Sequence, residues 1–227
     1  MTQGTDLWLR PLTVDDEATA LEAHRELATE GFEFLLGWRD EPWDAYLERV
    51  DDERRGKNLP EGWVPATFLI AEVKGQLVGR VSIRHRLNDH LAKVGGHIGY
   101  AVRPAFRRRG YATEILRQAL GIARETGIDR ALLTCDDVNH ASAATIERCH
   151  GRFESLISGH GGRATRRYWI QLAYQPPGLG GTFASHTRVR AVRGWSWRRR
   201  ERAGRAPRST KELISNGRDS GVRVDVR

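Results

Sequence analysis

The segment from residue 97 to residue 125 constrains the fold most, because it predicts a strand, a basic turn and a helix in direct succession. Residues 97–102 (HIGYAV) form an apolar run typical of a strand, and Pro104 ends it. Across 112–125, apolar side chains recur at the spacing of one buried helix face, at Ala112, Ile115, Leu116, Ala119, Leu120 and Ala123. The residues between these two elements must therefore turn tightly into the first turn of the helix.

The composition of this turn indicates an anion-binding site. The first N–H groups of a helix lack intrahelical partners and carry the positive end of its dipole, so they hold phosphate. Gly110 permits close approach of the backbone, and Arg107, Arg108 and Arg109 supply forked donors for phosphate oxygens. The pattern is not GxxxxGK[ST], so a nucleoside triphosphate is not the natural ligand. The alternative is that the three arginines are a solvated charge run.

The rest of the chain up to residue 174 predicts a mixture of strands and helices. A hairpin is expected from strands 67–73 and 77–87 around a turn at 74–76. In its second strand Val81, Ile83 and His85 share one face, and Ser82, Arg84 and Arg86 share the other. Proline and glycine favour a loop over 59–65. Further elements are expected as strands 7–12, 131–135, 152–158 and 167–172 and as helices 14–28, 42–55 and 142–149.

Charge divides the chain into two parts. Residues 186–227 hold thirteen Lys and Arg against four Asp and Glu, whereas residues 1–185 hold twenty-four against twenty-five. We expect a folded domain over 1–174 and a Pro/Gly linker with a basic, disordered tail over 175–227. The near-neutral domain gives no sign of a nucleic-acid-binding face. A nucleic-acid partner is therefore expected at most for the tail, where aromatic and basic residues mix over 195–200.

Several function classes are not expected from the composition. There is no run of about 18 apolar residues to span a membrane and no secretory signal pattern at the N-terminus. Cys135 and Cys149 have no partners at metal-binding spacing, and His140 and His150 lack a third ligand, so no metal site is expected. We interpret Cys149 as a buried thiol in preference to a nucleophile. These features together predict a cytoplasmic protein.

In these residues, the sequence resembles the GNAT superfamily of N-acetyltransferases. The acetyl-CoA motif of that superfamily, Arg/Gln-x-x-Gly-x-Gly/Ala, is matched by Arg107, Gly110 and Ala112. The resemblance covers about 6–174 and is strongest to a bacterial subgroup of predicted acetyltransferases with no assigned substrate. The strings shared with that subgroup are Leu-Pro-x-Gly-x-Val-Pro (59–65), Arg-His-x-Leu-Asn (84–88), Gly-Gly-His-Ile-Gly-Tyr (95–100) and Arg-Tyr-Trp-Ile (167–170).

The resemblance implies a fold and an activity. The fold would be α/β (α+β), with a mixed, mostly antiparallel twisted sheet of six to seven strands and about four flanking helices. That sheet would splay between strands 97–102 and 131–135 to form the cofactor cleft. The activity would be that of an acyltransferase for groups other than aminoacyl, moving acetyl from acetyl-CoA to a primary amine by direct attack in a ternary complex. The alternative is a catalytically weak acyl-CoA-binding module that acts as a sensor or partner protein.

The resemblance also implies which residues hold acetyl-CoA, here a co-substrate. The backbone of Ala101 and Val102 would pair with the pantetheine arm, and a backbone N–H there would polarise the thioester carbonyl. Asn139 and Ser142 would contact the pantetheine end. The pyrophosphate would lie on residues Arg107, Arg108, Arg109, Gly110, Tyr111, Ala112 and Thr113.

For the acid–base groups and the acceptor pocket, the sequence offers candidate residues, each with an alternative structural role. Many GNAT members carry a tyrosine acid seven residues after the asparagine, and Ile146 occupies that position here. His97, where related enzymes often have a glutamate, is a candidate base; otherwise it fixes the Gly95–Gly96 turn by local hydrogen bonds. His85 and Asn88 are candidates for the acceptor pocket; otherwise they are polar strand-end residues. The acceptor is expected to be a small-molecule or peptide amine, and a homodimer is left open.

Overall fold

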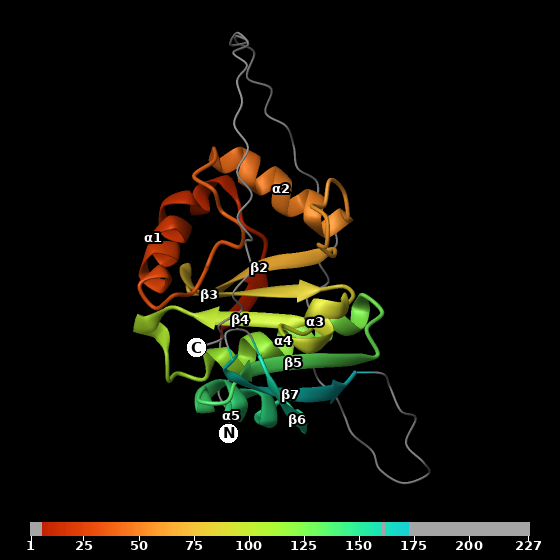
Figure 1. The fold of residues 1–227 in the computed structure, drawn as a ribbon. Coiled ribbons are helices and arrows are strands. Elements are labelled where there is room, and N and C mark those ends of the chain that lie inside the picture. Colours follow the sequence, from red (N-terminus) through yellow and green to blue (C-terminus); the bar gives the residue numbers. More distant parts are fainter. Residues whose placement is uncertain (1–5, 160–161, 173–227) are drawn as a thin grey trace, which may run out of the picture. The chain divides into compact units, whose positions relative to one another are not determined.

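The computed structural model describes residues 6–159 and 162–172, and these form two antiparallel sheets with helices packed on them (Figure 1). The first sheet has the order β1-β2-β3-β4, with every neighbouring pair antiparallel. The predicted hairpin is its centre, where Phe68 lies opposite Ser82 and Leu69 opposite Val81. Its strands are β1 (Leu7–Arg10), β2 (Ala66–Val73), β3 (Gln76–Arg84) and β4 (Ile98–Val102).

The second sheet has the order β5-β7-β6 and is also antiparallel. Its central strand, β7, pairs along its length with β5, from Arg130 opposite Gln171 to Asp136 opposite Thr165. The strands are β5 (Arg130–Asp136), β6 (Arg152–Ser158) and β7 (Ala164–Gln171). The predicted strands are thus present, but the backbone ladder is interrupted between β4 and β5, which is the splay expected for the fold.

Helices cover the first sheet on both faces, and each covering has its own apolar core. One core joins β-strand residues such as Val81 and Tyr100 to Ile115 and Leu116 of α4. The other lies under α1 and α2 and includes Phe34, Tyr46 and Ile70. The α-helices are α1 (Glu17–Ala28), α2 (Trp43–Arg55), α3 (Asp89–Lys93), α4 (Tyr111–Glu125) and α5 (His140–Arg148). Two 3-10 turns are η1 (Val14–Asp16) and η2 (Pro104–Phe106).

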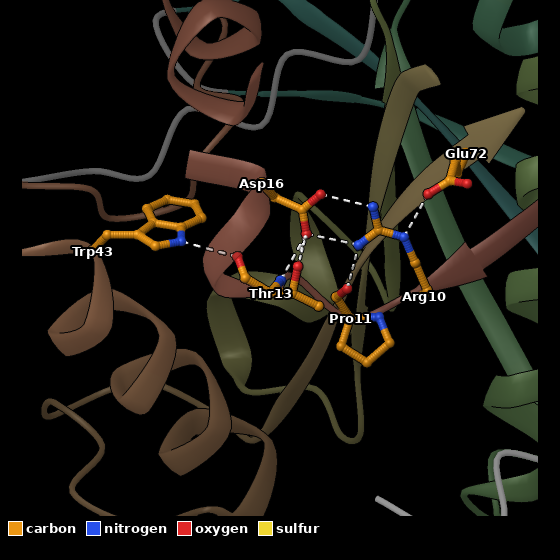
Figure 2. Close-up of polar contacts among 6 residues, drawn as sticks. All are labelled: Arg10, Pro11, Thr13, Asp16, Trp43 and Glu72. Carbon is orange, nitrogen blue, oxygen red and sulfur yellow. Dashed lines mark hydrogen bonds and ion pairs between the residues drawn. The ribbon is translucent and has the colours of Figure 1, made fainter. Parts of the chain in front are cut away.

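A buried polar network fixes α1 and α2 against the edge of this sheet (Figure 2). Arg10 of β1 donates to both carboxylate oxygens of Asp16 at 2.7 Å and to Glu72 of β2 at 2.6 Å. Thr13 donates to Asp16 through its backbone N–H, and its carbonyl accepts from the Trp43 indole at 3.0 Å. The N-terminal end of α2 is therefore attached to β1, which sets where the far end of α2 lies over the sheet.

The sequence-predicted helix 112–125 is confirmed as α4, with Ile115, Leu116, Ala119 and Ala123 buried as expected. The short helix α3 was not predicted, since it has five residues and none of them is buried. In the described ranges no helix has the length and apolarity needed to cross a membrane. The predicted linker and basic tail, 175–227, lie outside the described residues.

Candidate functional site

In the described residues, β4 and β5 are hydrogen-bonded to each other at one end only. At the start of β4, the backbone N–H of His97 donates to the Leu132 carbonyl at 2.7 Å, and the Leu132 N–H donates back to His97 Nδ1 at 2.9 Å. Two residues earlier, the Gly95 N–H donates to Thr134 Oγ1 at 2.9 Å. Five residues of strand span roughly 16 Å. The open end of β4, which is not paired with β5, is therefore about that far away, where β4 leads into the basic turn.

The basic turn offers backbone N–H groups to an anion. Arg108 (φ 63°) and Gly110 (φ 81°) both have left-handed backbone conformations, which is how successive N–H groups are directed into a concave nest. Gly110 is the N-cap of α4, and no side chain of the described residues caps this helix. A Cβ on Gly110 would meet nothing within 4 Å, so the space in front of it is open. This end of α4 fits a phosphate group.

The three arginines of the turn are arranged differently from one another. Arg107 forms a two-point ion pair with Glu30 beyond α1, at 2.6 and 2.9 Å, and its Nε donates to the Val102 carbonyl at 3.1 Å. Arg108 and Arg109 are exposed, and Arg109 donates only to the Ala105 carbonyl at 3.0 Å in the described residues. Two guanidinium groups therefore extend into solvent beside the helix start, while the third fixes the turn to the end of α1.

Asn139 and Ser142 lie at the start of α5, where β5 ends. Asn139 is the N-cap, and its Oδ1 accepts from the Ser142 N–H at 3.0 Å. The Nδ2 atom of Asn139 is buried and donates to no acceptor among the described residues. Such an orphaned donor costs free energy unless a ligand carbonyl accepts from it. Residues 136–141 also line a cavity of about 750 Å³, and the amide carbonyls of a pantetheine arm fit this donor.

His97 has a structural part in this arrangement. Its ring is buried, and with Nδ1 accepting from Leu132 only Nε2 is left for other partners. Burial and the nearby Arg84 guanidinium lower the pKa of His97, although the Leu132 hydrogen bond opposes this. The imidazole is therefore neutral near pH 7. Tyrosine is absent from the expected acid position, and Ile146 there is fully buried in the α4 core.

His85 and Asn88 follow β3, but they face different surroundings. His85 Nε2 is 2.8 Å from Thr67 Oγ1, and burial followed by the charge of Arg54 lowers the pKa of this histidine. Asn88 caps α3 by accepting from the Leu91 N–H at 2.8 Å, and it donates to the Gly62 carbonyl at 2.6 Å. Asn88 also lines a small cavity between α2, α3 and β3, whereas His85 does not.

This cavity holds two charged groups that the sequence did not reveal. Its volume is about 110 Å³, well below the roughly 300–1,000 Å³ of drug-sized ligand sites. Glu53 of α2 and Arg84 of β3 are on its wall, beside apolar and small residues. The floor includes Ser82, which is paired with Gly99 of β4. The remaining lining residues are Leu36, Gly37, Gly62, Trp63, Val64, Asn88, His90 and Leu91.

Glu53 has an unusual environment for a carboxylate. Burial raises its pKa to about 7, although Arg49 and Arg84 act in the opposite direction. Its carboxylate has no hydrogen bond or ion pair in the described part of the chain, and Arg49 is engaged with Glu41 at 2.6 Å instead. Partly buried carboxyls titrating near neutrality are typical of proton-transfer sites. No sequence motif marks Glu53, because it is brought to the cavity by the packing of α2 alone.

Arg80 and Arg84 are both buried on the face of β3 that α1 and α2 cover. Arg80 donates to the carbonyls of Gly99 at 3.2 Å and Glu33 at 2.9 Å, and it stacks on Phe32. Arg84 donates through Nη1 to Gly95 and Gly96, each at 3.3 Å. Burial lowers the pKa of Arg80 to about 9 and that of Arg84 to about 10, so both stay cationic at pH 7.

In the described residues, neither the cysteines nor the potential metal ligands form a second reactive site. Burial raises the pKa of both Cys135 and Cys149 to about 11, so neither is a thiolate near neutral pH. Among the residues that the structure describes, no three His, Cys, Asp or Glu side chains gather as a metal site would require.

Comparison with known proteins bears on this geometry. The model of the "Acetyltransferase (GNAT) domain" family matches residues 6–152, which is more than half of the chain. The chain belongs to the GNAT acetyltransferase family. That range includes the turn before α4, the Asn139 cap and the residues that line the cavity at Glu53. No curated protein sequence matches the chain.

Solved GNAT structures share the fold. RimJ of Mycobacterium smegmatis, in complex with CoA-disulfide, matches at a TM-score of 0.57 with 19% identity, covering 73% of this chain and 81% of that one. YncA of Salmonella typhimurium, a protein described as an acetyltransferase with its cofactor acetyl-CoA, matches at 0.52 with 16% identity, covering 76% and 97%. An N-acetyltransferase of Staphylococcus aureus Mu50 matches at 0.54 with 15% identity, covering 74% and 100%.

Proposed function

We propose that this GNAT protein transfers an acetyl group from acetyl-CoA to a primary amine, with the amine attacking the thioester directly in a ternary complex. The observation that carries the proposal is the uncapped N-terminus of α4 behind the nest at Arg108 and Gly110, at the end of β4 that is not hydrogen-bonded to β5. RimJ and YncA, of the same fold, are described with CoA-disulfide and acetyl-CoA.

Several groups of the chain would hold the co-substrate. Backbone N–H groups over 108–113 would donate to the pyrophosphate oxygens, and Arg108 and Arg109 would add positive charge from the solvent side. Arg107 would contribute through its backbone, since Glu30 already pairs with its guanidinium. Asn139 Nδ2 would donate to a pantetheine carbonyl, while Ala101 and Val102 would border the arm on β4. Acetyl-CoA supplies an activated thioester, and most of the rate would come from orienting the amine against it.

Binding and turnover test this proposal separately. Titration calorimetry with CoA and acetyl-CoA should give saturable binding below millimolar concentration. Gly110→Asp should abolish this binding by placing a carboxylate against the phosphates. Gly110→Ala places its Cβ in open space and should retain measurable binding. Unchanged affinity in Gly110→Asp would show that the phosphates lie elsewhere.

The second measurement is thiol release from acetyl-CoA in the presence of a panel of amines. An acetyltransferase releases CoA only when a suitable amine is present. Ile146 in place of a tyrosine acid favours the alternative, an acyl-CoA-binding module without turnover. Binding without thiol release across amines, amino acids and peptides would support that alternative.

A further inference from the structure

The small cavity between α2, α3 and β3 carries separated opposite charges. Glu53 and Arg84 act on each other electrostatically, but no ion pair within 4.0 Å joins them. Arg84 is largely buried and donates through Nη1 alone in the described residues; its Nε and Nη2 are not among the fully buried unpaired atoms, so they are accessible to a ligand in the cavity. Charges buried without full partners are costly unless a ligand completes them. A ligand bearing both a cation and an anion would complete this pair.

We propose that this cavity binds the acceptor as a small amino acid, with its carboxylate on Arg84 and its amino group on Glu53, and that Glu53 accepts the proton released during transfer. The proposal rests on the proposed function and deepens it. The position of the cavity supports the proposal, because Ser82 of its lining is paired with Gly99, so the cavity lies on the strand next to β4. The volume of about 110 Å³ admits a small molecule or the end of a larger one.

The amine nitrogen forms a bond to the acetyl carbon, and the carbon–sulfur bond breaks, with its electron pair leaving on the CoA sulfur as thiolate. The bound ammonium first gives one proton to the Glu53 carboxylate, which leaves a neutral amine to attack. The second proton leaves the nitrogen as the carbon–sulfur bond breaks and passes to the CoA thiolate or to solvent, and Glu53 returns its own proton to solvent. The charged and titratable groups facing Glu53 are Arg49 on its own helix, Arg84 on β3 and His90 of α3. A positive charge on either arginine favours the ionised carboxylate that this step needs.

Binding of amino acids to the full chain tests the recognition without any turnover. The probes are alanine, alaninamide, which lacks the carboxylate, and propanoate, which lacks the amine. Other small amino acids are each compared with their carboxamides in the same way. Calorimetry should give at least tenfold tighter binding of an amino acid than of its carboxamide. Intrinsic tryptophan fluorescence, to which Trp63 of the cavity wall contributes, is a second signal. Equal binding of every acid and its carboxamide would overturn the proposal.

Variants then test the two charges. Glu53→Gln should lower kcat at least tenfold and remove the acidic limb, near pH 7, of the rate–pH profile, while CoA affinity stays unchanged. Glu48→Gln, on an exposed position of the same helix, is the matched control and should behave as wild type. Arg84→Gln should weaken amino-acid binding at least tenfold, and Arg84→Lys keeps the charge should the first variant fail to fold. An unaltered pH profile in Glu53→Gln, with His97→Ala removing the limb instead, would assign the proton to His97 and overturn the role of Glu53.

The two proposals can fail separately. Amino-acid binding without thiol release would support the cavity assignment and contradict the proposed acetyl transfer. Thiol release that is as fast with alaninamide as with alanine would support acetyl transfer and contradict selection for a carboxylate.

Discussion

The two ends of β4 differ in how they are built, although arginine is prominent at both. At the end that leads into α4, Arg108 and Arg109 are exposed and the helix start is uncapped. At the other end, Arg84 is buried and holds the carbonyls of Gly95 and Gly96 at the closed junction with β5. The open end is formed by consecutive residues, whereas the closed end is assembled from α2, α3, β3 and β5. The proposed phosphate site is therefore local in sequence, whereas the proposed acceptor site is not.

The largest effect that this comparison predicts is on stability, from glycines with the same backbone conformation at the two ends. Gly96 (φ 61°) packs so closely that an added Cβ would lie 2.3 Å from the Leu132 carbonyl oxygen. Gly96→Ala should therefore cost about 3–5 kcal/mol in the free energy of unfolding, from the clash and the left-handed backbone together. Urea unfolding measures this loss.

Gly110→Ala is the control for that variant, since its Cβ meets nothing within 4 Å. Its cost should be limited to the backbone term of about 1–2 kcal/mol. Equal losses in the two variants would mean that the junction with β5 is no tighter than the turn before α4.

The next effect concerns Glu53 and pH, because its raised pKa of about 7 makes the folded state bind a proton that the unfolded state has lost. Between pH 4.5 and 7 the folded protein holds more protons, so this group makes stability fall as pH rises. Glu53→Gln lacks that contribution. Relative to wild type, the variant should gain about 2–3 kcal/mol on going from pH 4 to pH 8.

Unfolding of both proteins at the two pH values checks this expectation. The histidines with lowered pKa, including His97, act in the opposite direction, because they destabilise the fold as pH falls below their usual range. They are present in both proteins, so they cancel in the difference. A difference independent of pH would mean that the Glu53 carboxyl titrates in the cavity as it does in water.

The same contrast explains what could be predicted from the sequence. Strong periodicity in 112–125 gave α4, and alternating apolar runs gave the hairpin β2–β3, because these patterns arise within one element. The turn at Arg107–Gly110 was predicted to be an anion site for the same reason. In the sequence, Glu53 is one of several charged residues in a predicted helix. Only the packing of α2, attached through Trp43 and Thr13, brings it over β3. Arg84 likewise alternates with apolar residues as a solvent-facing residue would.

The smallest effect is expected at Glu30, which pairs with Arg107 in a partly exposed ion pair at 2.6 Å. Pairs of this exposure contribute about 0.2–1 kcal/mol, so Glu30→Gln should lower stability by no more than that. The variant also removes a negative charge beside the turn and releases the Arg107 guanidinium toward solvent. CoA binding should therefore tighten by about two- to threefold at low salt, and the gain should vanish as salt screens the charges. Calorimetry at two salt concentrations measures this change. A loss of CoA affinity in Glu30→Gln would show that the ion pair shapes the phosphate nest, and that the open end of β4 depends on α1 as the closed end depends on α2.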